Sequence, residues 1–116
     1  MFWGKLASIN LYNCDHNLIQ DKRYIKKYIL EVCKVIDMKR FGKPIIKKLG
    51  SGSLEGVSAF QFIETSSITM HFDDKIKNRA FIDIFSCKDF DEKKAEEFSK
   101  SFFGAEKSIS KVMIRD

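Results

Sequence analysis

The chain has only two segments with helical periodicity, and this number restricts the folds open to it. Apolar side chains form one stripe within residues 17–37, and a second helix is expected from residue 89 or 91 to residue 103. Two helices cover only one face of a sheet, so a two-layer arrangement follows. The expected helix ends are Asp15 or Asn17 as the first N-cap, Asp89 or Asp91 as the second, and Gly104 as the final stop.

Most of the remaining chain alternates between apolar and polar side chains, which is the periodicity of β-strands. The strand-like segments are residues 2–12, 45–48, 57–63, 67–72, 79–87 and 108–114. The order of elements is therefore β-α-β-β-β-β-α-β within one domain, residues 1–116. We expect the α+β class: a two-layer sandwich in which a mainly antiparallel sheet carries two helices on one face.

The net charge of the 116-residue chain is +5, but acidic and basic residues are interleaved, as on a solvated surface. No basic tail or nucleic-acid-binding motif accompanies them, so no nucleic-acid partner is expected. Cys14, Cys33 and Cys87 lack metal-ligand spacing, and an odd number of cysteines argues against a disulfide framework. No apolar segment approaches the roughly 18 residues of a membrane span. These features favour a cytoplasmic protein with no metal centre and no membrane contact.

Polar residues that could carry chemistry gather on one strand. Ser67, Thr69 and His71 share one face of the strand at residues 67–72, but the Gly-x-Ser-x-Gly elbow of serine hydrolases is absent. The glycine- and serine-rich residues 49–56 form a loop without the ending of a P-loop, and either an active-site loop or a plain connector fits it. Taken alone, His71 fits a structural role as well as a functional one.

Three segments taken together are more informative. Gly56-Val57-Ser58 is followed by Glu64-Thr65-Ser66-Ser67-Ile68-Thr69-Met70-His71 and then by Ala80-Phe81-Ile82-Asp83-Ile84-Phe85-Ser86-Cys87. This order resembles the core of the bacterial and archaeal S-adenosylmethionine decarboxylases, in which a histidine follows the cleaved serine by five residues and a cysteine ends the next strand. The steps here are five residues from Ser66 to His71 and sixteen from His71 to Cys87. The resemblance extends to residues 11–15 and 103–106, and is weakest between residues 38 and 54.

The resemblance implies a self-processing zymogen. The hydroxyl of Ser66 would attack the carbonyl of Thr65, and elimination would then split the chain and leave a pyruvoyl group at residue 66. That cofactor would form a Schiff base with S-adenosylmethionine and accept electrons as carbon dioxide leaves, supplying the aminopropyl donor of polyamine (spermidine) synthesis. By the same resemblance, Ser58 and His71 assist processing, and Cys87 is the proton donor. It further implies a cytoplasmic homodimer with sites at the interface.

Two departures from the family pattern leave alternatives open. Thr65 replaces the glutamate that precedes the cleaved serine, with Glu64 one place earlier, so Ser67 or Thr65 could also be the reacting hydroxyl. The segment after the histidine is altered as well, which suggests the same machinery acting on ornithine or arginine. A non-cleaving homologue that binds a ligand or regulates a partner is the third hypothesis. The residues expected to contact substrate are Glu64, Ile68, Phe72 and Asp74.

Overall fold

The structure is a computed structural model that describes residues 2–116. Its helices and strands follow the predicted order, with bounds that differ from the predicted ones by a few residues. The strands are β1 (Gly4–Tyr12), β2 (Ile45–Leu49), β3 (Gly56–Ile63), β4 (Ser66–Asp73), β5 (Arg79–Ser86) and β6 (Lys107–Arg115). The helices are α1 (Lys22–Val35) and α2 (Glu92–Phe102), and short 3-10 turns span Leu18–Gln20 and Gly52–Leu54.

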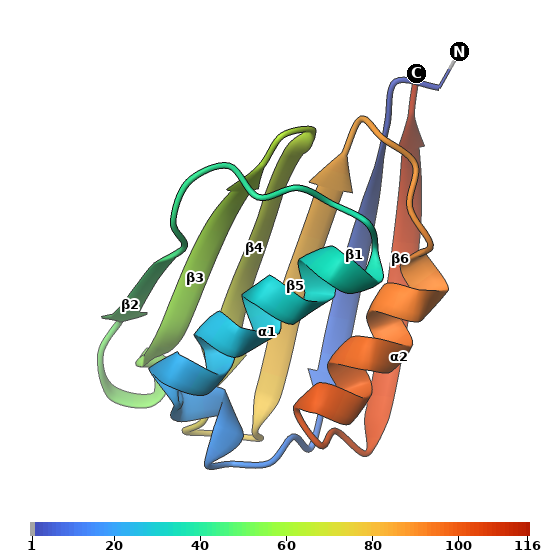
Figure 1. The fold of residues 1–116 in the computed structure, drawn as a ribbon. Coiled ribbons are helices and arrows are strands. Elements are labelled where there is room, and N and C mark those ends of the chain that lie inside the picture. Colours follow the sequence, from blue (N-terminus) through green and yellow to red (C-terminus); the bar gives the residue numbers. More distant parts are fainter. Residues whose placement is uncertain (1) are drawn as a thin grey trace.

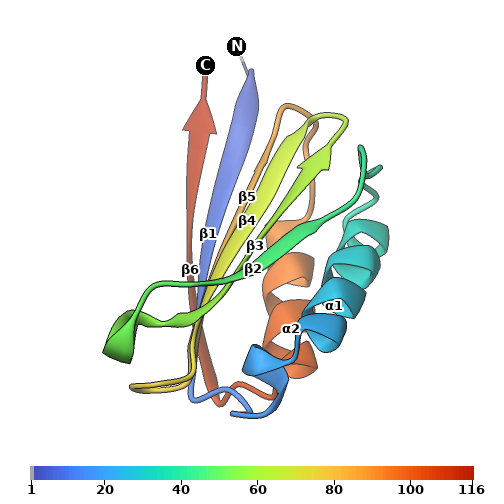
Figure 2. The same ribbon diagram turned by 90° about the vertical axis from the view of Figure 1, so that its left-hand side faces the viewer.

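One six-stranded sheet forms the backbone of the fold, in the order β2-β3-β4-β5-β1-β6. All neighbouring strands are antiparallel. Both helices lie on the same face of this sheet, α1 and α2 side by side, and the opposite face is left open (Figures 1 and 2). The predicted α+β fold class, with two helices on one face, is confirmed.

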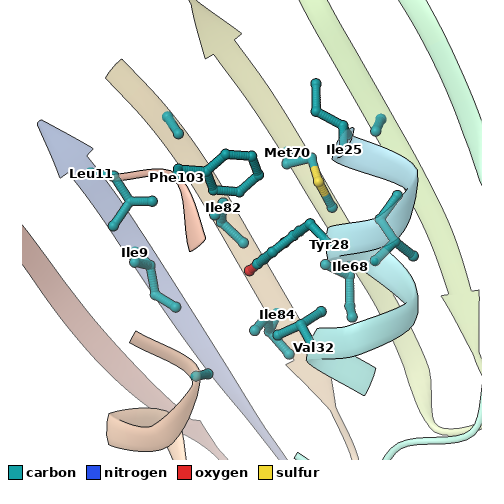
Figure 3. Packing of buried hydrophobic residues seen from close by; sticks show 14 of the residues in the cluster. Ile9, Leu11, Ile25, Tyr28, Val32, Ile68, Met70, Ile82, Ile84 and Phe103 are labelled. Atoms are coloured by element: carbon teal, nitrogen blue, oxygen red, sulfur yellow. The ribbon is translucent and has the colours of Figure 1, made fainter. Parts of the chain in front are cut away.

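The core lies between the helices and the alternate residues of the strands that face them. Ile9, Ile68, Ile82 and Ile84 have no exposed surface and meet the stripe of α1 that contains Tyr28 (Figure 3). Strand alternation therefore separates two kinds of surface on the same strands. The residues between these isoleucines point to the open face.

Helix ends show one difference from the sequence expectation. Asp21, and neither Asp15 nor Asn17, caps α1, because its side chain accepts hydrogen bonds from two backbone N–H groups of the first turn. The Asp15 carboxylate instead accepts from the backbone at the 3-10 turn that precedes the helix. Asp91 caps α2, as one of the two expected residues, and Gly104 follows the helix with a φ of 61°, which favours glycine.

The open face of the sheet carries a mixture of aromatic and polar side chains. Phe60 and Phe62 of β3 pack edge to face with ring centroids 4.6 Å apart, and Phe62 is 55% exposed. Phe81 and Phe85 of β5 are half-buried on the same face. No helix in residues 2–116 has both the length and the apolar composition that crossing a bilayer demands.

Candidate active site

The β3–β4 hairpin places the predicted cleavage point at one end of the sheet. Glu64 and Thr65 form its two-residue turn, and Ser66 is the first residue of β4. Ser66 pairs with Ile63 across the hairpin and with Ser86 on β5. The end of β5 and the connection between α1 and β2 reach the same end of the sheet (Figure 1). The backbone around residues 65 and 66 is therefore held from both sides.

The carbonyl of Thr65 has a defined hydrogen-bond donor. The backbone N–H of Cys87 donates to the Thr65 carbonyl oxygen, with an N···O distance of 2.9 Å. This is the carbonyl that the Ser66 hydroxyl would attack. A donor at that oxygen polarises the carbonyl and stabilises the negative charge that develops there during attack. The Thr65 carbonyl oxygen thus already has a backbone donor.

The side chain of Thr65 points inward to a buried partner. Its Oγ1 lies 2.7 Å from Oγ of Ser86 and 3.5 Å from Sδ of Met38. Ser86 is fully buried and also accepts a hydrogen bond from the backbone N–H of Lys88 at 3.0 Å. Of the three candidate hydroxyls, that of Thr65 is therefore already engaged.

Ser58 and His71 form the second polar group of the site. They are direct partners in the β3–β4 ladder, and Ser58 Oγ lies 2.9 Å from Nδ1 of His71. Both side chains are on the open face, where His71 is exposed. A hydroxyl and an imidazole at hydrogen-bond distance can relay a proton.

Ser66 and the Ser58–His71 pair lie apart within one chain. His71 lies five residues after Ser66 on β4, a distance of about 17 Å at the usual strand rise. The structure therefore joins the backbone of Cys87 to Thr65 and the side chain of Ser58 to His71, but it does not bring Ser66 and His71 together within one chain.

The cysteines differ in their surroundings. Burial raises the pKa of both Cys14 and Cys33 to about 11. Cys87 is exposed, next to the end of β5. The cysteine whose backbone bonds to Thr65 is thus the exposed one.

The four residues expected to contact substrate divide into two pairs. Ile68 is fully buried and Phe72 is 5% exposed, and the Phe72 ring packs against Phe103. Both residues lie on the helix-facing side of β4. Glu64 is exposed in the hairpin turn, whereas the Asp74 carboxylate is buried and lies 3.2 Å from Lys75 Nζ.

Sequence reasoning missed two features of the open face. A cavity of about 230 Å³ adjoins His71, and the Arg79–Asp73 ion pair (2.7 Å) forms one side of it. Burial acts to raise the pKa of Asp73, but hydrogen bonds from the Ile76 backbone and from Arg79 outweigh it and lower that pKa. The glycine- and serine-rich loop contributes the opposite wall. The other lining residues are Ser53, Leu54, Glu55, Phe72, Ile76 and Phe81.

The second missed feature is an aromatic cluster near Cys87. The rings of Trp3 and Phe85 stack with centroids 6.1 Å apart, and the Arg115 guanidinium lies 4.7 Å from the Phe85 centroid. Phe85 pairs with Ser67 across β4 and β5, so the cluster lies beside the start of β4. It joins residues from both ends of the chain, and no local sequence pattern indicates that.

A buried lysine holds the segment that follows Cys87. Lys5 Nζ donates to the Phe90 carbonyl oxygen at 2.5 Å and lies 2.7 Å from carboxylate oxygens of Asp89 and Glu92. Burial acts to lower the pKa of Lys5, but its hydrogen bonds to the two carboxylates outweigh burial and raise that pKa. The hydrogen bond from Lys5 in turn lowers the pKa of Glu92. These contacts fix the loop between β5 and α2. Among residues 2–116, no group of three or more His, Cys, Asp and Glu side chains could hold a metal ion.

Comparisons with known proteins agree with this arrangement. A family model for S-adenosylmethionine decarboxylase matches residues 5–116. The crystal structure of the adenosylmethionine decarboxylase from Aquifex aeolicus has a TM-score of 0.81 to this structure at 16% identity, covering 98% of this chain and 91% of that one. The structural similarity shows a shared fold, and the family match runs along nearly the whole chain. The chain belongs to the S-adenosylmethionine decarboxylase family.

Proposed function

We propose that this chain is a zymogen that cleaves itself between Thr65 and Ser66 and then decarboxylates S-adenosylmethionine, supplying the aminopropyl donor of spermidine synthesis. The observation that supports this most strongly is the hydrogen bond from the Cys87 N–H to the Thr65 carbonyl oxygen, at 2.9 Å, at the peptide bond that precedes Ser66. Three unpaired cysteines suit the reducing cytoplasm as the compartment.

The cleavage chemistry follows from the residues at this end of the sheet. Ser66 Oγ attacks the Thr65 carbonyl carbon, the amide C–N bond breaks, and an ester forms while the amine of residue 66 takes up a proton. Cys87 N–H stabilises the oxyanion of the intermediate. Loss of the α-proton of residue 66 then expels Thr65 as a carboxylate, and hydrolysis of the resulting enamine releases ammonia.

The product of this sequence is a ketone at residue 66 that suits the site. A pyruvoyl group supplies an electron sink for the carbanion left when carbon dioxide departs from an amine-linked substrate. In this proposal Cys87, which is exposed and whose backbone bonds to Thr65, returns a proton to the substrate carbon. A thiol is one of the side-chain groups that can donate a proton in such a step.

A second copy of the chain completes the site. Ser58 and His71 lie too far from Ser66 to act on it within one chain, and both are on the open face of the sheet. The same face exposes aromatic side chains such as Phe62, which a second sheet would cover at the usual spacing of about 10 Å. We therefore propose a homodimer in which the open faces pack and each Ser66 is served by the partner's Ser58 and His71.

The first experiment separates enzyme from non-cleaving homologue. Intact mass of purified protein should show two fragments that meet between Thr65 and Ser66, and Ser66→Ala should remain whole. Release of labelled carbon dioxide is then measured with S-adenosylmethionine, ornithine and arginine. Wild-type protein in one unbroken piece would exclude the proposed processing and leave the binding or regulatory role.

The dimer hypothesis has its own test. His71→Ala chains should stay whole when expressed alone, as should Ser66→Ala chains. When the two are co-expressed, mixed dimers contain one site with an intact Ser66 and an intact histidine from the other copy, so part of the His71→Ala chain should split. Cleavage of His71→Ala on its own, or none in the mixture, would contradict action across the interface.

A second candidate substrate is supported by one observation. Phe72 and Ile68 are buried and Asp74 is held by Lys75, so three of the four expected substrate contacts are engaged within the chain. This favours, as the alternative, decarboxylation of ornithine or arginine by the same machinery. The substrate panel above distinguishes the two, because only one of the amino acids should release carbon dioxide at a substantial rate.

A further inference from the structure

We propose that the hydroxyls of Thr65 and Ser86 form a positioning pair for self-cleavage, which holds the Thr65 carbonyl on the Cys87 N–H and leaves Ser66 as the reacting hydroxyl. We call these two residues the Thr65–Ser86 clamp. This inference rests on the proposed function. It assigns a role to the residue at which the chain departs from its family's glutamate.

Both hydroxyls of the clamp have hydrogen-bond partners. Ser86 Oγ accepts from the Lys88 N–H at 3.0 Å and lies 2.7 Å from Thr65 Oγ1. One of the two hydroxyls donates to the other, and the hydroxyl that accepts can donate its own proton to Met38 Sδ. That sulfur lies 3.5 Å from Thr65 Oγ1 and 3.7 Å from Ser86 Oγ. Neither buried hydroxyl is left without a partner, so the arrangement costs no unsatisfied polar group.

The clamp and the backbone bond act on the same peptide group. The side chain of Thr65 is tied to Ser86, and its carbonyl is tied to the next residue, Cys87. Rotation of the peptide plane that would turn the carbonyl toward solvent strains both bonds together. A threonine side chain also has few rotamers, which makes the pair stiffer than a longer side chain would be. The attacked carbonyl is thereby held in one orientation.

The clamp also distinguishes between the neighbouring hydroxyls. Thr65 Oγ1 is engaged with Ser86, so it is not free to attack the carbonyl of Glu64. Ser67 lies one residue further along β4, with its side chain on the open face beside Phe85. The carbonyl polarised by Cys87 belongs to Thr65, and the hydroxyl of the following residue is that of Ser66.

The clamp is anchored to the end of α1. Lys88 follows the clamp on the β5 side, and its Nζ donates to the carbonyl oxygen of Asp37 at 2.7 Å and to its carboxylate at 3.1 Å. Met38, the next residue, contacts both clamp hydroxyls. Three segments far apart in sequence therefore meet around one peptide bond.

The first arm of the test measures the first-order rate at which fragments appear. Thr65→Val keeps the shape of the side chain and removes its hydroxyl, Thr65→Ser keeps the hydroxyl, and Ser86→Ala removes the partner. Thr65→Val and Ser86→Ala should each slow cleavage about tenfold, equivalent to about 1.4 kcal/mol in the barrier. The double variant should be little slower than either single one, and Thr65→Ser should cleave near the wild-type rate. Ser101→Ala, on the exposed side of α2, is the matched control.

The second arm measures hydrogen exchange of the Cys87 amide by NMR in a Ser66→Ala background, where no cleavage intervenes. Exchange should be faster in Thr65→Val and Ser86→Ala and unchanged in Ser101→Ala. Unchanged Cys87 exchange, or wild-type cleavage rates in Thr65→Val, would overturn the clamp while leaving the proposed function standing. Equal slowing of Thr65→Ser and Thr65→Val would overturn it too, since the hydroxyl would then be irrelevant. An unsplit wild-type chain refutes the proposed function, and the exchange arm still decides whether the clamp holds the carbonyl.

Discussion

The contact between the two helices gives a prediction whose size follows from the structure. Tyr28 of α1 and Ser99 of α2 are both fully buried, and their hydroxyl oxygens are 2.5 Å apart (Figure 3 shows Tyr28 pointing toward α2). Ser99 donates its own proton to the Ala95 carbonyl oxygen at 2.7 Å. Tyr28 must therefore be the donor between the two hydroxyls. Burial raises the pKa of Tyr28, which keeps that proton in place.

This direction of donation makes the two single substitutions unequal. Tyr28→Phe leaves Ser99 bonded to Ala95, so it should cost about 1 kcal/mol, the net value of one hydrogen bond. Ser99→Ala leaves a buried O–H donor with no partner, and about 2 kcal/mol is expected. The double variant removes that unsatisfied donor and should be more stable than Ser99→Ala alone.

Urea denaturation of uncleaved protein, in a Ser66→Ala background, measures all three variants. The melting temperature should fall by about 4 °C for each kcal/mol in a domain of this size. A cost for Tyr28→Phe at least as large as that for Ser99→Ala would refute the assigned donor. So would a double variant less stable than Ser99→Ala, because removing a partnerless hydroxyl should restore stability.

Three other substitutions test separate features. The hydrogen bonds from Ser108 and Ser110 lower the pKa of Glu96 below its ordinary value of 4.5. The stability that these bonds add is therefore present above that pH and is lost as the pH falls. The difference in unfolding free energy between wild type and Glu96→Gln should be constant near pH 7 and shrink below pH 4.5. Lys5→Met should lower stability by about 1–2 kcal/mol and speed amide exchange in the loop after Cys87, and unchanged exchange there would show that Lys5 does not hold this loop. Phe62→Glu should convert a dimer into monomers in analytical ultracentrifugation, whereas a dimer that persists would place the interface elsewhere.

The fold could be predicted because its periodicities are strong. Alternation across β4 and β5 identified the helix-facing residues, and two amphipathic helices sufficed to indicate a one-sided sheet. The cap of α1 could not be chosen in this way. Asp15 and Asp21 are both good N-cap residues, and only the path of the chain through the 3-10 turn at Leu18–Gln20 decides between them.

The sequence indicates candidate residues for the site, but it does not indicate how the fold arranges them. The five-residue step from Ser66 to His71 resembles that of the family, yet on a strand it also separates the two residues by about 17 Å. Sequence spacing identifies which residues a family uses, and it does not show which copy of the chain supplies them. The contact between Thr65 and Ser86 depends on the register of β4 against β5, which the turn between them sets over residues 74–78. A single sequence does not reveal that register.

The departure from the family pattern at residue 65 leads to one more prediction. Resemblance to the family alone would suggest the opposite result. Thr65→Glu would restore the residue that the family has before its cleaved serine. In this chain it would also remove the hydroxyl that lies 2.7 Å from Ser86 Oγ and bring a carboxylate toward a fully buried serine. The carboxylate would have to turn to solvent, taking the Thr65 peptide off the Cys87 N–H. We expect Thr65→Glu to cleave more slowly than wild type, with Thr65→Ser as the control that keeps the hydroxyl. If Thr65→Glu cleaves as fast as wild type or faster, then the backbone bond alone holds the Thr65 carbonyl. The threonine in place of the family's glutamate would then be a neutral difference.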